Sequence, residues 1–179
     1  MAYGDRPIGM DHPSQWLAVL RIVVGLYFAK AILTKLGIVL LGGVVPLPAA
    51  SERWIAMMPV IVAKQAVGNP LLFYKTFLEQ TVLTHPALFA HLTAWGEALV
   101  GIGLTFGLLT GTASIVGLWL VIVYGLASYW MSPSQPFFHI MIGALMVAFF
   151  FARAGRTWGV DGRIARRRPK SAWTRRPIA

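Results

Sequence analysis

Leu88 to Leu109, LFAHLTAWGEALVGIGLTFGLL, is the stretch that decides the fold. It is long and apolar enough to cross a bilayer, whose ~30 Å hydrocarbon core needs about 20 helical residues. Glu97 nevertheless lies near its middle. A charged carboxylate at that depth costs roughly 2.5–3.5 kcal/mol on insertion scales, so it should face protein or water, lose its charge, or pair with a cation. We therefore expect the rest of the chain to surround this helix.

The composition assigns the whole chain to a membrane. Of its 179 residues, 57% are hydrophobic and only 12% are charged, which leaves too little polar surface for a soluble domain. The net charge of +10 would suggest nucleic acid in a soluble protein, but nine of the sixteen basic residues lie at or after Arg153. A basic tail beside a span is first a topology signal, so nucleic-acid binding is not expected. The absence of cysteine excludes disulfides and cysteine-ligated iron–sulfur clusters.

Four segments are long and apolar enough to cross the membrane, and they predict an all-α membrane protein, a four-transmembrane-helix bundle. The predicted spans are 17–36, 88–109, 112–131 and 136–153. They form one membrane domain over 17–154, between an N-terminal segment, 1–16, and a basic tail, 155–179.

The long segment 37–87 is broken by glycines and prolines and is expected to be an outer loop. Within it, 54–68 is apolar but short and interrupted by Pro59, which suits an interfacial or re-entrant element. Asn69, followed by proline, has the pattern of a helix N-cap. The helix it would start, 71–83, has one apolar and one polar face, so we expect an amphipathic helix at the membrane interface.

Loop charges give an orientation. The tail from Arg153 has nine basic residues and one acid, whereas 37–87 has three basic residues and two acids. By the positive-inside rule the tail is cytoplasmic, and with four spans the N-terminus is cytoplasmic as well. We therefore expect a multi-pass protein of the bacterial cytoplasmic (inner) membrane, with Trp158 and Trp173 as interfacial anchors. The arginines expected to dock on anionic lipid or on a partner subunit are Arg163, Arg166, Arg167 and Arg168.

One polar side chain in each predicted span falls at a similar depth. With a rise of 1.5 Å per residue from the cytoplasmic ends, Lys30, Glu97, Tyr124 and His139 all lie at about 18–21 Å. We expect a buried polar layer in which Lys30 and Glu97 form the ion pair and the other two side chains hydrogen-bond around it. Such a layer either fixes helix register or forms a site for a quinone head group or a proton path.

Other features of the sequence suggest packing more than chemistry. Gly103, Gly107 and Gly111 recur every fourth position, which predicts one small-residue face for helix packing. A lone histidine such as His139 or His91 could ligate haem or a pigment, but no pair has bis-histidine spacing. No catalytic triad, phosphate-binding glycine loop or metal cluster is evident, so no catalytic residue and no intrinsic cofactor is predicted.

Three short motifs at the ends of the spans carry a family resemblance. They are R-x3-G-x9-K at Arg21, Gly25 and Lys35, an acid with GLTFGLLTGTA after it at Glu97, and the turn AGRTWGVDG around Asp161. These motifs resemble the DoxX family of small four-helix membrane proteins. The resemblance implies a membrane subunit linked to oxidoreductases such as thiosulfate:quinone oxidoreductase. Ile32, Leu33 and the long outer loop depart from the family pattern.

Three functions remain open from the sequence. The first is an accessory, structural subunit of a bacterial electron-transfer complex, respiratory or photosynthetic, with lipids and other membrane subunits as partners. The second is a quinone-reactive subunit of a thiosulfate:quinone-type enzyme. The third is a transporter of a small solute or lipid, which the lack of broken helices in two matching halves disfavours.

Overall fold

The computed structural model describes residues 12–41, 45–168 and 177–178. Four of its helices are long and apolar enough to cross a membrane, which confirms the predicted all-α four-span fold. They are α1 (Pro13–Thr34), α4 (Pro86–Phe106), α5 (Thr110–Ser128) and α6 (Ser134–Phe151). Each begins and ends two to four residues before the corresponding predicted span.

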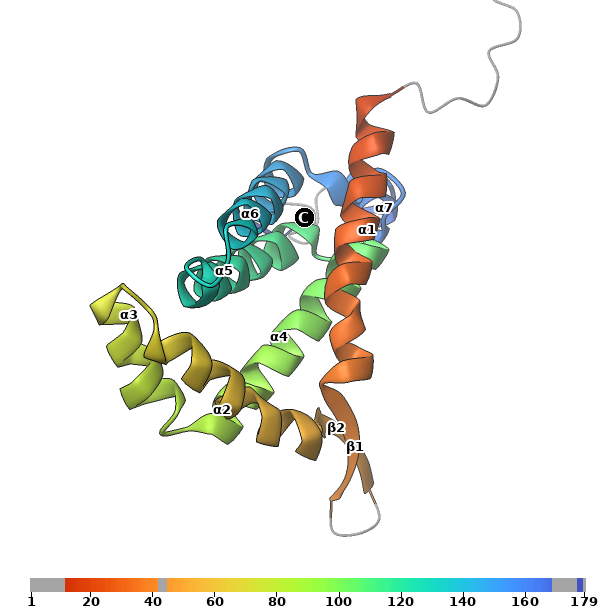
Figure 1. Ribbon diagram of the computed structural model, residues 1–179. Helices are drawn as coiled ribbons and strands as arrows, with labels where there is room; N and C mark the ends of the chain where they lie inside the picture. The colour runs from red at the N-terminus through yellow and green to blue at the C-terminus, as the bar shows by residue number, and fades with distance from the viewer. Residues whose placement is uncertain (1–11, 42–44, 169–176, 179) are drawn as a thin grey trace, which may run out of the picture.

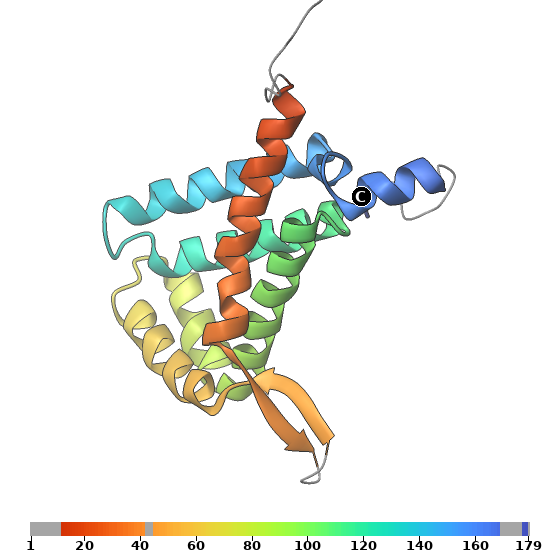
Figure 2. The same ribbon diagram turned by 90° about the vertical axis from the view of Figure 1, so that its right-hand side faces the viewer.

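The four long helices form two pairs that diverge. Helix α1 lies along α4, and α5 lies along α6. Figure 2 shows α5 and α6 running across α1 instead of parallel to it, so the pairs are close together near α7 (Val160–Arg167) and spread apart toward the other end. The space between the diverging pairs is closed at that end by the segment that links α1 to α4.

Glycines set the close approach of α1 to α4. A Cβ atom on Gly25 would overlap the backbone of Thr105, and one on Gly101 would overlap the backbone of Ala29. The two helix backbones therefore touch where these glycines cross, as small residues permit in membrane helices.

The glycine repeat predicted as one packing face is divided between two helices. Gly107 is the C-cap of α4 in the left-handed conformation, with φ +63°, which glycine adopts without strain. It ends α4, so Gly111 falls in the first turn of α5. Gly103 alone packs as expected, because a Cβ there would lie 2.8 Å from that of Ala113.

The outer segment is more ordered than the sequence indicated. It contains a two-stranded antiparallel hairpin, β1 (Leu36–Leu41) and β2 (Val45–Ala50), which was not predicted. Next comes α2 (Glu52–Val67), a continuous helix that includes Pro59 and begins at the N-cap Ser51. The expected amphipathic helix consists of α3 (Leu72–Phe77) and a single π-helical turn, η1 (Leu78–Val82).

Asn69 ties this outer segment to the membrane helices, although it is not the helix N-cap predicted for it. Its side-chain amide donates to the carbonyl oxygen of Leu126 in α5 at 2.9 Å, and its Oδ1 accepts from the backbone N–H of Leu71 at 3.0 Å. The side chain is buried and both of its ends are hydrogen-bonded, so the turn before α3 is fixed against α5. Tyr74 adds a second tie by donating to the carbonyl oxygen of Val123 at 2.7 Å.

Candidate functional site

A three-residue polar cluster lies between the two helix pairs. The ammonium of Lys35, just beyond α1, lies 2.6 Å from Oε1 of Glu97 in α4. The hydroxyl of Tyr124 in α5 donates to the same oxygen, also at 2.6 Å. The side chains of Lys35 and Glu97 are 18% and 9% exposed, so the charged pair is largely removed from solvent. One carboxylate oxygen thus joins three elements that are distant in the sequence.

Aromatic rings hold the Lys35 ammonium in place. Its Nζ lies 4.1 Å from the ring centroid of Trp54 in α2 and 5.9 Å from that of Tyr124. The indole N–H of Trp54 donates to the carbonyl oxygen of Ala90 at 3.1 Å and fixes the ring against α4. A cation over aromatic faces is stabilised without being neutralised, so Lys35 keeps its N–H donors.

The cluster lies at one wall of a large cavity. The cavity has a volume of about 630 Å³ and is lined by residues of α1, α2, α3, η1, α4, α5 and α6. Most of its lining is aliphatic or aromatic, and Lys35, Glu97 and Tyr124 are among its few polar groups. Its other polar lining residues are Tyr27, Lys30, Gln65, Tyr74, Thr93, Ser128, Gln135 and His139. An apolar cavity of this size with a few convergent polar groups is the usual form of a small-molecule site.

Glu97 and Tyr124 are brought together as expected, but the cation is Lys35 and not Lys30. Lys30 instead lies over the ring of Tyr27, 4.3 Å from its centroid. His139 also lines the cavity, but its Nδ1 is 2.7 Å from the carbonyl oxygen of Gln135 in its own helix.

The buried residues of α1 form a stripe along one face of the helix, and this stripe explains why Lys35, and not Lys30, is the partner of Glu97. The buried residues of α1 include Arg21, Phe28 and Ala31, at spacings of three, four or seven residues, and Lys35 continues this stripe four residues after Ala31. Lys30 is one position off the stripe and is exposed. The depth calculation compared only the rise along each helix and not the face on which each side chain lies, and Lys30 lies on a face of α1 that is turned away from Glu97. The R-x3-G-x9-K spacing contained the signal, since it includes Lys35 and omits Lys30.

Arg21 lies at the opposite end of the bundle, where the helix pairs come together, and is fully buried. Its guanidinium donates to the carbonyl oxygens of Leu104 and Thr105 at the end of α4. It also donates at 3.5 Å to the carbonyl oxygens of Thr157 and Trp158, in the turn after α6. One side chain therefore connects the first, second and fourth membrane helices.

Asp161 adds further hydrogen bonds at the same end of the bundle as Arg21. Its two carboxylate oxygens accept the backbone N–H groups of Leu109 and Thr110, each at 2.9 Å, and so cap the start of α5. The backbone N–H of Asp161 donates to the carbonyl oxygen of Gly107 at 2.9 Å. We call Arg21, Gly107 and Asp161, with these backbone partners, the locked end. Its residues come from all three sequence motifs, so those motifs have a structural role here.

The four arginines on α7 and at its end face outward. Arg163, Arg166, Arg167 and Arg168 are exposed on or just after α7, and Trp158 is 55% exposed before it. Trp173 lies outside the described residues. Within residues 12–41 and 45–168, no group of three or more histidine or acidic side chains is arranged to hold a metal ion.

Comparison with known families assigns the chain. The family model described as "TQO small subunit DoxD" matches residues 16–175. The chain belongs to the DoxD family. Among curated proteins and among solved structures, no match was found.

Membership of the DoxD family agrees with the fold and with the composition of the site. The family is the small membrane subunit of thiosulfate:quinone oxidoreductase, and the chain is a multi-pass membrane protein linked in this way to quinone-reactive complexes. The matched region contains the locked end, the polar cluster and the whole cavity.

Proposed function

We propose that this DoxD-family protein is a membrane subunit of a quinone-reactive oxidoreductase and that it binds the quinone ring in the cavity beside Lys35, Glu97 and Tyr124. The observation that carries the proposal is the pairing of two donors on one carboxylate oxygen at the wall of a mostly apolar cavity. Between the two alternatives for a membrane subunit left open by the sequence, this geometry favours the quinone-reactive one.

The cluster has the chemistry that a quinone carbonyl needs. Lys35 has three N–H donors and directs one of them to Glu97, so others are available to a carbonyl oxygen in the cavity. Tyr124 directs its one O–H to Glu97, so its hydroxyl oxygen can accept a hydrogen bond at the cavity wall, for example from the hydroxyl of a reduced quinone. A bound quinone accepts electrons together with protons, and Glu97 is placed to exchange a proton with either neighbour. The electrons would come from a partner subunit.

The locked end supports a second part of the proposal, a structural contribution to the complex. Arg21 and Asp161 tie α1, α4, the start of α5 and the turn after α6 together at one end, so the helix pairs can diverge around the cavity toward the other end. We further propose that this locked end, with the exposed arginines of α7, lies on the cytoplasmic side of a bacterial inner membrane. Those arginines would then contact anionic lipids or a neighbouring subunit.

The proposed site is tested by quinone binding to the purified chain in lipid nanodiscs. A ring-only benzoquinone and a long-chain one would each be titrated against the wild type and the variants Lys35→Met, Glu97→Gln and Tyr124→Phe. We expect Lys35→Met to weaken binding by about tenfold or more, which corresponds to 1.4 kcal/mol. The matched control is Lys30→Met, which removes a lysine from the cavity edge and should change the affinity little.

Two results would overturn the proposal. One is the absence of saturable quinone binding to the wild type while its thermal unfolding remains cooperative. The other is equal loss of binding in Lys30→Met and Lys35→Met, because the polar cluster would then have no special part in the site.

A further inference from the structure

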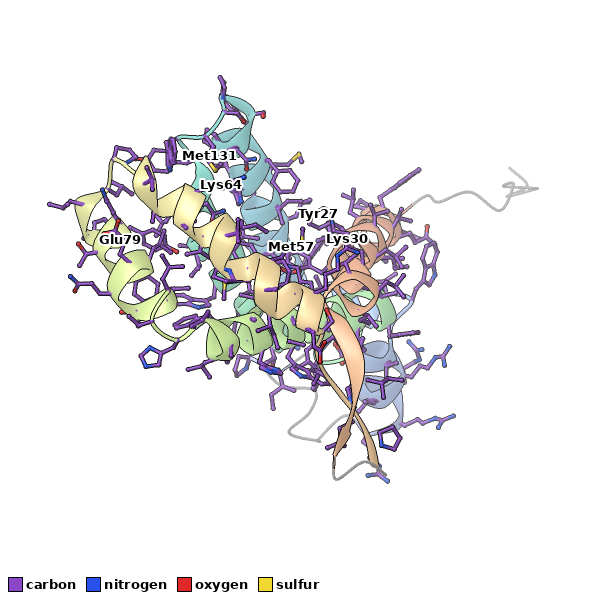
Figure 3. The ribbon with its side chains drawn as sticks, turned by 60° about the horizontal axis from the view of Figure 1, so that its bottom comes forward. Tyr27, Lys30, Met57, Lys64, Glu79 and Met131 are labelled. Carbon is purple, nitrogen blue, oxygen red and sulfur yellow. The ribbon has the colours of Figure 1, made fainter. Side chains whose placement is uncertain are left out.

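Two aromatic residues that line the cavity, one on α1 and one on α6, are also exposed. Tyr27 of α1 and Phe138 of α6 both line the cavity, and they are 42% and 37% exposed. Their ring centroids are 5.7 Å apart, so the two side chains meet edge to face across the gap. Figure 3 shows Tyr27 beside Lys30, whose ammonium lies over the tyrosine ring. We call the gap spanned by Tyr27 and Phe138 the portal.

The helices on either side of the portal are not packed against each other over most of their length. Helices α1 and α6 belong to different pairs, and they make few contacts compared with α1 and α4 or α5 and α6. The Tyr27–Phe138 ring contact is therefore a bridge of side chains and not a tight helix interface. Aromatic side chains at such a gap can change rotamer without moving the backbone.

Apart from Lys30, which lies over the ring of Tyr27, the exposed residues next to the portal are apolar. On α1 the exposed neighbours of Tyr27 include Val23 and Leu26, each 57% exposed. On α6 Phe137 is 74% exposed, and Met141, one turn after Phe138, is 56% exposed. Tyr27 lies seven residues before the end of α1, which is about 10 Å along the helix axis. The portal thus opens within the apolar belt that faces lipid.

The portal residues and the polar cluster line the same, mostly apolar cavity. Phe28 of α1 and Ile142 of α6 are buried lining residues of this cavity. The ligand that fits has a polar ring at one end and a long hydrocarbon chain at the other. The ring would lie at Lys35 and Tyr124, and the chain would leave between the helix pairs.

We propose that the portal gives the site lateral access from the membrane. A quinone with a long isoprenoid chain enters through it from the lipid, and when the ring is bound, the chain extends out between Tyr27 and Phe138. This inference rests on the proposed function. To the proposed quinone site it adds that the quinone comes from the lipid phase. It also assigns Tyr27 and Phe138 as the residues that line the route of the quinone into the site.

The absence of cysteine in the chain allows a direct test. The double variant Tyr27→Cys/Phe138→Cys would be reconstituted in nanodiscs and then joined with a short bismaleimide. Binding of a long-chain benzoquinone and of its ring without the chain would be measured before and after linking. The matched controls are the two single-cysteine variants treated with the same reagent, since they carry the modification without closing the portal.

We expect linking to slow or weaken binding of the long-chain quinone by at least about tenfold, while the chain-free ring binds nearly as before. The unlinked double variant and the treated single variants should bind both probes. If the linked protein binds the long-chain quinone at the unlinked rate, the portal assignment is overturned and the site beside Lys35 is unaffected. If neither probe binds the wild type, it is the proposed function that fails.

Discussion

Lys35 and Glu97 are 62 positions apart in the sequence, yet their charged atoms lie 2.6 Å apart at the wall of the cavity. The contact joins the end of α1 to the middle of α4 on the side where the helix pairs have separated. An ion pair in this position acts both on stability and on any ligand that enters the cavity.

Removing one member of this pair should destabilise the protein more than removing both. Lys35→Met leaves the Glu97 carboxylate with little solvent and no cation, at an expected cost on the order of 3 kcal/mol. In Lys35→Met/Glu97→Gln no charge is left uncompensated, so its stability should be closer to the wild type. Thermal unfolding in detergent, arranged as a double-mutant cycle, measures the coupling. Lys30→Met is the control, and a loss as large as that of Lys35→Met would contradict the assigned pair.

Asp161→Ala should be among the most destabilising single substitutions. It removes both acceptors of the Leu109 and Thr110 N–H groups and the acid nearest to the buried Arg21, for a loss on the order of 3–5 kcal/mol. Asp161→Asn keeps one acceptor oxygen and should recover part of this loss. Arg163→Ala, in the same short helix but exposed, should leave the unfolding temperature nearly unchanged. Equal effects of the Asp161 and Arg163 variants would argue against the locked end.

The α1–α4 crossing predicts opposite results for two glycine-to-alanine substitutions in α4. Gly101→Ala puts a methyl group into the backbone of Ala29 and should cost about 1–3 kcal/mol through forced separation of the helices. Gly96→Ala meets only Leu120 Cδ1, at 3.4 Å, and gains the higher helix propensity of alanine, so it should be neutral or stabilising. Unfolding temperatures of the two variants decide the matter. A stable Gly101→Ala protein would mean that the helices do not cross there.

Tyr74 predicts a loss of stability in alkaline solution. Its burial in the outer segment raises its pKa from 10.0 to about 12. Below pH 10 the hydroxyl is protonated in the folded and the unfolded state alike. Between about pH 10 and pH 12 the unfolded chain loses this proton first, so the free energy of unfolding falls, by on the order of 2 kcal/mol over the whole interval.

Tyr74→Phe is the measurement for this pH effect. It should lower stability at neutral pH by about 1 kcal/mol, because the carbonyl oxygen of Val123 loses its donor. The stability advantage of the wild type over Tyr74→Phe should then shrink as the pH rises above 10 and reverse before pH 12, in unfolding curves recorded side by side. A difference that stays constant to pH 12 would show that Tyr74 does not titrate in this range.

Composition and span length determined the class of the protein without a structure. A run such as 88–109 can satisfy its backbone inside a bilayer only as a helix, so four such runs fix a four-helix membrane fold. The motifs at Arg21, Glu97 and Asp161 also indicated the family, because the residue spacing of a short motif can be read directly from the sequence. The amphipathic element over α3 and η1 was visible for the same reason, since its apolar face repeats with the helical period.

The partner of Glu97, the hairpin of β1 and β2, and the cavity depended on tertiary structure. A depth count gives the height of a side chain along its helix, whereas the close contact of α1 with α4 at Gly25 and Gly101 decides which face of α1 meets α4. On that face Lys35 lies beside Glu97, and Lys30 is left at the cavity edge with Tyr27. Local pattern fixes which residues are helical and which face is apolar, whereas the angle between helices is set by side-chain contacts between distant segments.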